Sequence, residues 1–140
     1  NGSLFSIARN KWHSTKDLFW CVLSFDPEIM THPGVLFATT NNAYLLTERA
    51  PNIEGFEALF GSSVRQFPTK WATRSKATLP YHTTCNQAEV LYPLAVPIGY
   101  LRRVYVMSRD NFHEVEAQIE FCAPHIAGKF QIVVAPEHFI

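Results

Sequence analysis

The apolar positions of the chain fall into short runs separated by turn-forming residues. Residues 18–25, Leu-Phe-Trp-Cys-Val-Leu-Ser-Phe, form a continuous apolar run that Asp26 and Pro27 end. A run of this length predicts a buried strand, and the proline and acidic residue after it predict a helix of one or two turns. Residues 35–39, Val-Leu-Phe-Ala-Thr, predict a second strand that leads into a polar turn.

The middle of the chain combines a short helix with a long basic segment. Apolar residues between Ile53 and Phe60 recur with helical spacing, and Gly61 marks the end of that helix. Residues 62–84 show no regular period, and basic side chains alternate there with aromatic ones. We interpret this segment as a long loop, a feature that is uncommon in compact domains and often functional.

The second half of the chain predicts the longest helix. Residues 109–122 place apolar side chains three or four positions apart, with Asp110 or Asn111 as the cap. Three further runs predict strands, at residues 88–92, 102–107 and 130–135. Because this order of elements mixes helices and strands without regular alternation, the predicted fold class is α+β.

Composition and charge narrow the functional class. The 140 residues are 47% hydrophobic, which is enough apolar side chain for one domain over residues 1–140. The 12 Lys and Arg balance the 12 Asp and Glu, which argues against a protein that coats nucleic acid without specificity. A local basic face is compatible with this balance. Three cysteines are too few for a disulfide framework, and no apolar run reaches the ~18 residues of a membrane span. These features indicate a soluble cytoplasmic protein with no membrane partner.

Gln87 and Glu89 stand where the basic segment meets a predicted strand. Residues two apart on a strand share a face, so the amide and the carboxylate would lie side by side, with Ala88 and Val90 packed on the other face. A carboxylate in this position can stabilise positive charge on a sugar ring and hold a ribose hydroxyl. A solvent-facing glutamate on a half-buried strand gives the same spacing, and spacing alone does not decide between the two.

The basic segment supplies candidates for nucleic-acid binding. Its cations would contact phosphates while Trp71 or Tyr81 stacks on a base, a combination that suits single strands. The candidate set is Arg65, Lys70, Trp71, Arg74 and Lys76. A solvated loop whose aromatic residues fill the core is the alternative.

Two His/Cys pairs have the spacing of zinc ligands. His82 and Cys85, like Cys122 and His125, are separated by two residues. Cys122, however, lies on the apolar side of the predicted helix, where a small core residue is expected. Cys85 with a histidine partner also fits a nucleophile, although no family-type signature surrounds it.

Several segments together resemble the DarT family of DNA ADP-ribosyltransferases. Residues 87–101 are similar to the family's Gln-Ala-Glu segment and the Val-Pro step after it. Residues 17–25 resemble its central apolar strand, and residues 34–43 resemble the strand that leads into an Asn-Ala turn. Trp71 before a basic stretch and the ending at residues 131–139 agree in order. The resemblance is spread over nearly the whole chain.

The resemblance implies an ADP-ribosyltransferase-like split mixed β-sheet with NAD as co-substrate and no metal. ADP-ribose would pass to a base of single-stranded DNA, with RNA or protein as other conceivable acceptors. Glu89 matches the catalytic glutamate and Gln87 the supporting position, while Asn41 and Asn42 would contact NAD. A toxin or phage-defence role follows, with an antitoxin or ADP-ribosyl hydrolase as partner.

The N-terminal part departs from the family pattern. Family members usually open with a His-containing segment that grips NAD and with an Arg before a stretch similar to residues 4–8, and neither is present. We therefore expect the N-terminal part of the family domain to be missing, and no spacing supports Arg9 or His13 as a replacement. The alternative function is a catalytically inactive domain that recognises nucleic acid or protein.

Overall fold

The computed structural model describes residues 18–139, and the chain divides into two compact units. Among the described residues, the terminal unit contains residues 18–26 and 97–139, and the central unit is Pro27–Val96. Both units combine helices with short strands, which confirms the predicted mixture of α and β structure. The expected organisation of residues 1–140 as one domain stays a prediction.

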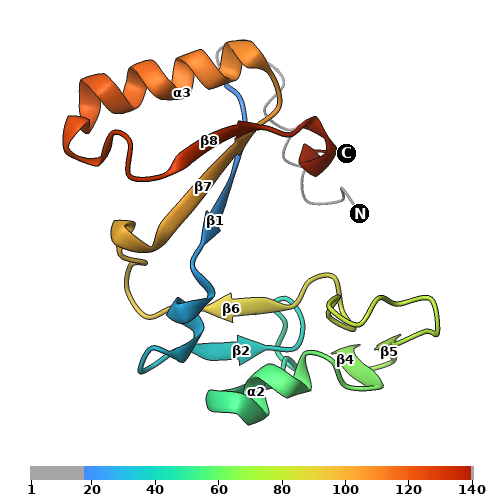
Figure 1. The fold of residues 1–140 in the computed structure, drawn as a ribbon. Helices are drawn as coiled ribbons and strands as arrows, with labels where there is room; N and C mark the ends of the chain where they lie inside the picture. The colour runs from blue at the N-terminus through green and yellow to red at the C-terminus, as the bar shows by residue number, and fades with distance from the viewer. Residues whose placement is uncertain (1–17, 140) are drawn as a thin grey trace. The chain divides into compact units, whose positions relative to one another are not determined.

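The terminal unit contains a three-stranded mixed sheet. Its order is β1-β7-β8, with β1 (Cys21–Phe25) antiparallel and β8 (Gln131–Val134) parallel to the central β7 (Leu101–Val106). A parallel pair needs a long crossover, and α3 (Arg109–Cys122) supplies it between β7 and β8 (Figure 1). The predicted strands and the predicted helix are confirmed in this unit.

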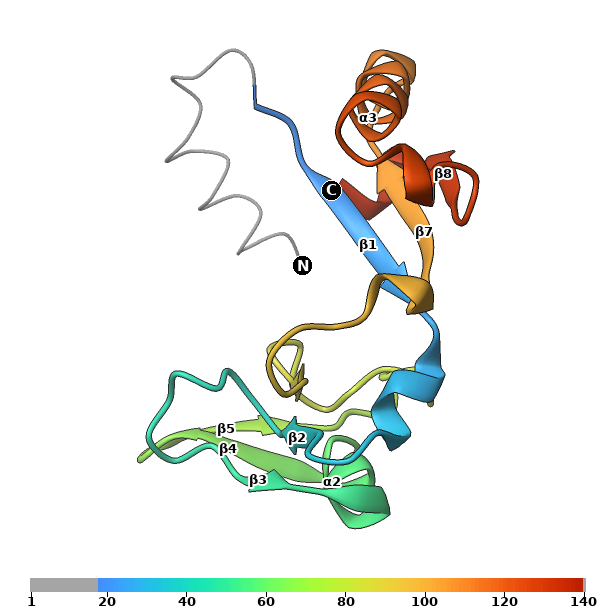
Figure 2. The ribbon, with the colours of Figure 1, turned by 90° about the vertical axis from the view of Figure 1, so that its left-hand side faces the viewer.

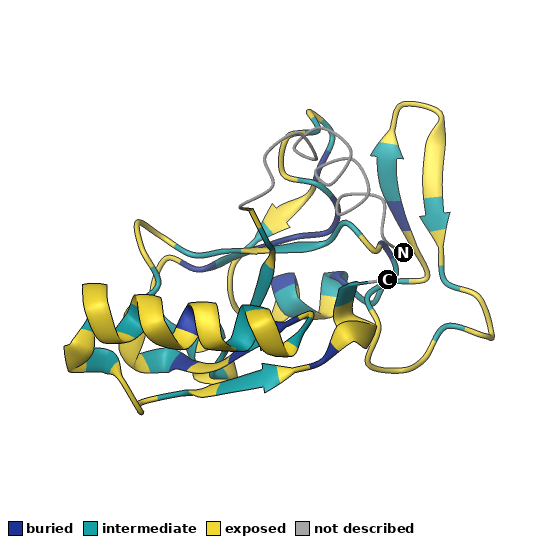
Figure 3. Ribbon diagram, turned by 90° about the horizontal axis from the view of Figure 1, so that it is seen from above, coloured by how far each residue is buried: buried dark blue, intermediate teal, exposed yellow. Residues whose placement is uncertain are grey.

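The core of the terminal unit lies between α3 and the sheet. Val104 and Val106 of β7 are buried against Val115 of α3, and the outer surface of the helix is exposed (Figure 3). Strand β1 is less buried than its apolar sequence predicts, since Leu23 is 52% exposed. The predicted helix cap is also wrong, because Ser108 is the N-cap and its hydroxyl accepts the backbone N–H of Asn111 at 3.2 Å. A residue before the periodic pattern therefore performs the capping.

The central unit is built on an antiparallel sheet of order β3-β2-β6. Its strands are β3 (Arg49–Ala50), β2 (Leu36–Ala38) and β6 (Glu89–Leu91). Helix α2 (Asn52–Ala58) packs beside β2 and β3 (Figure 2). Phe37 of β2 meets Phe56 of α2 edge to face, with ring centroids 5.6 Å apart.

The prediction of a long loop over residues 62–84 is wrong in its first half. Strands β4 (Ser63–Phe67) and β5 (Lys70–Thr73) form a hairpin there. Buried Val64 lies opposite Ala72, but a register shift between Arg65 and Phe67 interrupts the pairing. Such a bulge breaks the two-residue alternation by which a strand is recognised, and this explains why the sequence shows no period.

The remaining regular structure consists of single turns. The predicted short helix after residue 26 is confirmed as a 3-10 turn at Pro27–Thr31. Other 3-10 turns lie at Ile98–Tyr100, Pro124–Ile126 and Pro136–Phe139. Within residues 18–139 no helix has the length and apolar character needed to cross a bilayer.

Gly55 provides a test of the packing in the central unit. A Cβ at this position would lie 2.1 Å from the carbonyl oxygen of Ala50, whereas a Cβ on Gly99 would meet nothing within 4 Å. We expect Gly55→Ala to lower the free energy of unfolding by about 1–3 kcal/mol through overpacking. Gly99→Ala should leave it unchanged or raise it by up to about 1 kcal/mol. Urea titration of both variants checks the difference, and equal effects would contradict this packing.

Candidate functional site

The candidate site begins with a row of three residues across the central sheet. Ala38 of β2 pairs with Arg49 of β3 on one side and with Glu89 of β6 on the other. Directly opposite residues in antiparallel strands project to the same face, so Arg49 and Glu89 flank the buried methyl group of Ala38. Phe37, the neighbour of Ala38, packs toward α2 on the opposite face. Helix α2 thus fixes the face on which the carboxylate stands.

The predicted turn at Asn41 and Asn42 is confirmed, and it contacts this row. The backbone N–H of Asn42 donates to Glu89 Oε2 at 3.0 Å. Asn41 Oδ1 accepts the backbone N–H of Ala43 at 2.8 Å, and the Asn41 carbonyl accepts the Thr47 hydroxyl at 2.7 Å. The two asparagines therefore differ in what they do: Asn41 shapes the turn, whereas Asn42 touches the carboxylate.

Gln87 contacts the same turn from a position just before β6. Its Oε1 accepts the hydroxyl of Tyr44 at 3.2 Å. The ring centroids of Tyr44 and Phe67 lie 4.5 Å apart, so Phe67 of β4 in the hairpin packs against the residue that holds Gln87. The structure thus brings Gln87 and Glu89 to one turn. Val90, predicted to be packed, is 41% exposed instead.

Cys85 is a buried structural residue next to this site. It is 1% exposed, and its sulfur lies 3.1 Å from Gln66 Nε2 and 3.3 Å from the Thr40 hydroxyl. Among the described residues, no group of three or more His, Cys, Asp or Glu is arranged to hold a metal ion. Cys122, expected in the core of the helix face, is exposed, because it ends the last turn of α3 beyond the buried Val115.

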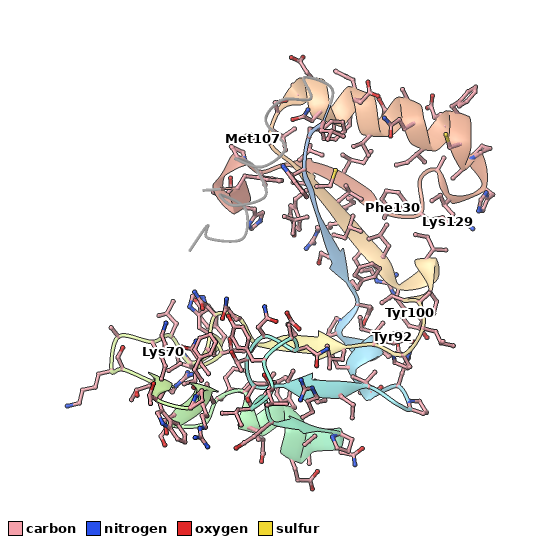
Figure 4. The ribbon with its side chains drawn as sticks, turned by 180° about the vertical axis from the view of Figure 1, so that it is seen from behind. Lys70, Tyr92, Tyr100, Met107, Lys129 and Phe130 are labelled. Atoms are coloured by element: carbon pink, nitrogen blue, oxygen red, sulfur yellow. The ribbon has the colours of Figure 1, made fainter. Side chains whose placement is uncertain are left out.

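The β4–β5 hairpin carries an arginine stacked on an exposed tryptophan. Arg65 and Trp71 are paired across the two strands, and the guanidinium carbon lies 5.8 Å from the centroid of the Trp71 ring. Trp71 is 54% exposed, and Lys70 beside it begins β5 (Figure 4). Residues 62–84 contain four basic and no acidic side chains, so this surface is locally positive despite the balanced charge of the chain.

Arg74 holds the segment after the hairpin in shape. Its Nη1 donates to the carbonyl of His82 at 2.7 Å, and its Nη2 donates to the carbonyls of Leu79 and Pro80 at 2.9 and 3.1 Å. Both Nη atoms of the Arg74 guanidinium therefore donate to main-chain carbonyls. Lys76, by contrast, is exposed, so Lys76 is the better placed of the two for a phosphate.

Arg49 and Tyr44 are site residues that sequence analysis missed. Arg49 donates through Nε to Asn42 Oδ1, and Tyr44 bonds to Gln87. Neither belongs to a periodic pattern, since β3 has only two residues and Tyr44 lies in a turn. Their spacing to Glu89 carries no local signal. Arg9 and His13, which no spacing supports as replacements, lie outside the described residues, as do residues 4–8.

Comparison with known proteins gives two matches. A sequence model of the family described as "ssDNA thymidine ADP-ribosyltransferase, DarT" matches residues 1–140. Among solved structures, the chain is similar to "Thermosipho africanus DarTG in complex with ADP-ribose", with 14% sequence identity and a TM-score of 0.54. The alignment covers 85% of this chain and 28% of that chain, so this likeness concerns the fold. No curated protein sequence matches.

The bonds of Arg74 predict the behaviour of the segment that it holds. Arg74→Met removes charge-assisted bonds to three carbonyls, so we expect trypsin to cleave after Lys76 about tenfold faster, as for ~1.4 kcal/mol of lost local stability. Arg65→Met is the control, because Arg65 bonds to Pro68 within the hairpin. Mass spectrometry of a digestion time course gives both rates. Equal rates in the two variants would show that Arg74 does not order this segment.

Proposed function

Because the chain belongs to the DarT family, we propose that it is an NAD-dependent enzyme that ADP-ribosylates thymidine in single-stranded DNA. The observation that carries this proposal is the carboxylate of Glu89, which a backbone N–H holds through Oε2. Within the described part of the chain, Oε1 accepts no hydrogen bond from protein. One oxygen is thus fixed by the fold and the other is available to a ligand.

This reaction requires the protein mainly to position the reactants and to stabilise the charge that develops on them. The bond between C1′ of the ribose and the nicotinamide nitrogen breaks, and its electron pair leaves with nicotinamide. A bond between C1′ and a base nitrogen forms, and the proton of that nitrogen passes to solvent. Glu89 polarises the ribose through a hydroxyl and stabilises positive charge that develops on the ring. Gln87, held by Tyr44 at Oε1, keeps its amide N–H groups for the incoming base. Preorganised groups of this kind need no metal.

The residues present fit NAD at this turn. Asn42 Nδ2 and Glu89 Oε1 offer a hydrogen-bond donor and an acceptor beside the bond that joins the two residues, as a ribose with vicinal hydroxyls requires. Asn41 supports that edge from within the turn. The mixed sheet β1-β7-β8 and the antiparallel sheet β3-β2-β6 are the elements that we assign to the split sheet of an ADP-ribosyltransferase.

We assign single-strand binding to the hairpin and the segment after it. Lys70 and Lys76 contact phosphates, and the exposed face of Trp71 stacks on a base. The Arg65 guanidinium over the indole preserves the ring orientation while adding positive charge. A toxin role with an antitoxin or ADP-ribosyl hydrolase partner completes the proposal, in line with the DarTG protein to which the fold is similar.

Substitution of the carboxylate tests the catalytic assignment. Glu89→Gln preserves shape and removes the charge, so we expect transfer of labelled ADP-ribose from NAD to a thymidine-containing single strand to fall about 10²- to 10³-fold. Glu48→Gln, on the same unit beside Arg49, should retain activity. Undiminished labelling by Glu89→Gln would remove the glutamate from the mechanism.

Calorimetric titration with NAD separates an enzyme from an inactive recognition module of the same fold. An enzyme binds NAD and shows weaker binding when Asn42 is replaced by Asp, because an added carboxylate beside Glu89 repels the pyrophosphate. A module that binds single-stranded DNA and shows no heat with NAD would favour the second function.

The assignment of the hairpin to DNA binding predicts how substitutions there change the affinity for a single strand. Trp71→Ala should weaken binding to a thymidine-rich single strand by about 1–3 kcal/mol, the contribution of one stacked base. Lys70→Ala should lower the slope of log K against log salt by about 0.7, the value for one phosphate contact. Trp20→Ala, which removes a tryptophan of similar exposure in the terminal unit, is the control. Fluorescence anisotropy measures all three, and equal losses for Trp71 and Trp20 variants would exclude the hairpin.

A further inference from the structure

We propose that Arg49 is a positioning residue for Glu89 and acts through Asn42, an inference that rests on the proposed function of Glu89. The two residues occupy the outer strands of one row, with Ala38 between them. Two strand spacings separate their main chains by about 10 Å. Asn42 bonds to both side chains, so a single turn residue connects the arginine to the carboxylate.

The guanidinium of Arg49 grips the turn with all three of its nitrogens. Nε donates to Asn42 Oδ1, and Nη2 donates to the carbonyl of Asn42. Nη1 donates to the carbonyl of Thr47 at 2.8 Å, and Nη2 also lies 3.4 Å from the carbonyl of Tyr44. These acceptors are neutral oxygens of one turn. The arginine is therefore a geometric clamp on residues 42–47, a task for which its planar fork is suited and a lysine is not.

Arg49 holds Asn42 both at its side-chain oxygen and at its carbonyl oxygen, and this fixes the direction of the Asn42 backbone N–H. That N–H is the donor to Glu89 Oε2. The terminal torsion of a glutamate is broad, and Asn42 lies in an exposed turn, where main chain is more mobile than in a strand. Without Arg49 the carboxylate would therefore sample several orientations. With Arg49 in place, Oε1 has a defined position relative to the ribose that it must meet.

Steady-state kinetics of two substitutions tests the clamp. Arg49→Met removes the charge and the fork, and we expect kcat to fall about 10²-fold with little change in KM for NAD, as for a misplaced catalytic group. Arg49→Lys keeps the charge but cannot bond bidentately to Asn42, so we expect a similar loss. Full activity of Arg49→Lys would show that charge alone matters and would overturn the clamp. Arg103→Met, at an arginine bonded to Gln131 in the terminal unit, should behave as wild type.

The same substitution in a Glu89→Gln background distinguishes positioning from general stability. If Arg49 acts only through the carboxylate, Arg49→Met should lower the residual activity of Glu89→Gln less than twofold. A further loss of the same size as in the wild-type background would mean that Arg49 does not work through Glu89. Arg49→Lys, the milder change, takes the place of Arg49→Met if the latter fails to fold.

A readout without activity keeps this inference separate from the proposed function. In an otherwise wild-type chain, the amide resonance of Asn42 should shift when Glu89 is replaced by Gln, because the carboxylate accepts that N–H. Both Arg49 variants should largely abolish this shift, whereas Arg103→Met should not. An unchanged shift in the Arg49 variants overturns the clamp. A wild-type chain that transfers no ADP-ribose overturns the proposed function, and the amide resonance then decides the clamp alone.

Discussion

The site depends on one hydrogen bond, from the backbone N–H of Asn42 to Oε2 of Glu89. It joins residues 47 positions apart in sequence and ties the turn to the first residue of β6. A carboxylate that accepts a main-chain N–H is restrained without losing its charge. Helix α2 contributes from the opposite face, where Phe56 packs on Phe37 and so sets the direction in which Glu89 projects.

A second connection leads from the site to the positive surface. Tyr44 donates to Gln87 and packs against Phe67 of β4. Tyr44 therefore connects the hairpin, which we assign to DNA binding, with Gln87, which we assign to the target base. Arg74 orders the segment between hairpin and strand through main-chain carbonyls. Basic residues of this unit thus fall into two groups: some shape the chain, and others are left for a ligand.

The sequence predicted those elements whose signal is local. The helix Arg109–Cys122 has the predicted bounds, because its apolar side chains repeat over several turns. The β4–β5 hairpin was mistaken for a loop because a bulge after Arg65 interrupts its alternation. Resemblance to a family singled out Glu89 and Asn42, but nothing local reveals their contact. Arg49 was missed since a two-residue strand has no period, and its role depends on pairing with Ala38.

In the proposed complex, Glu89 contacts the ribose of NAD through one carboxylate oxygen while the backbone N–H of Asn42 holds the other. A crystal structure of the chain with a non-hydrolysable NAD analogue tests this most directly. We expect a hydroxyl of the nicotinamide ribose within hydrogen-bond distance of Glu89 Oε1, with Oε2 still accepting the backbone N–H of Asn42. A ribose bound away from Glu89, or a carboxylate detached from the turn, would contradict it.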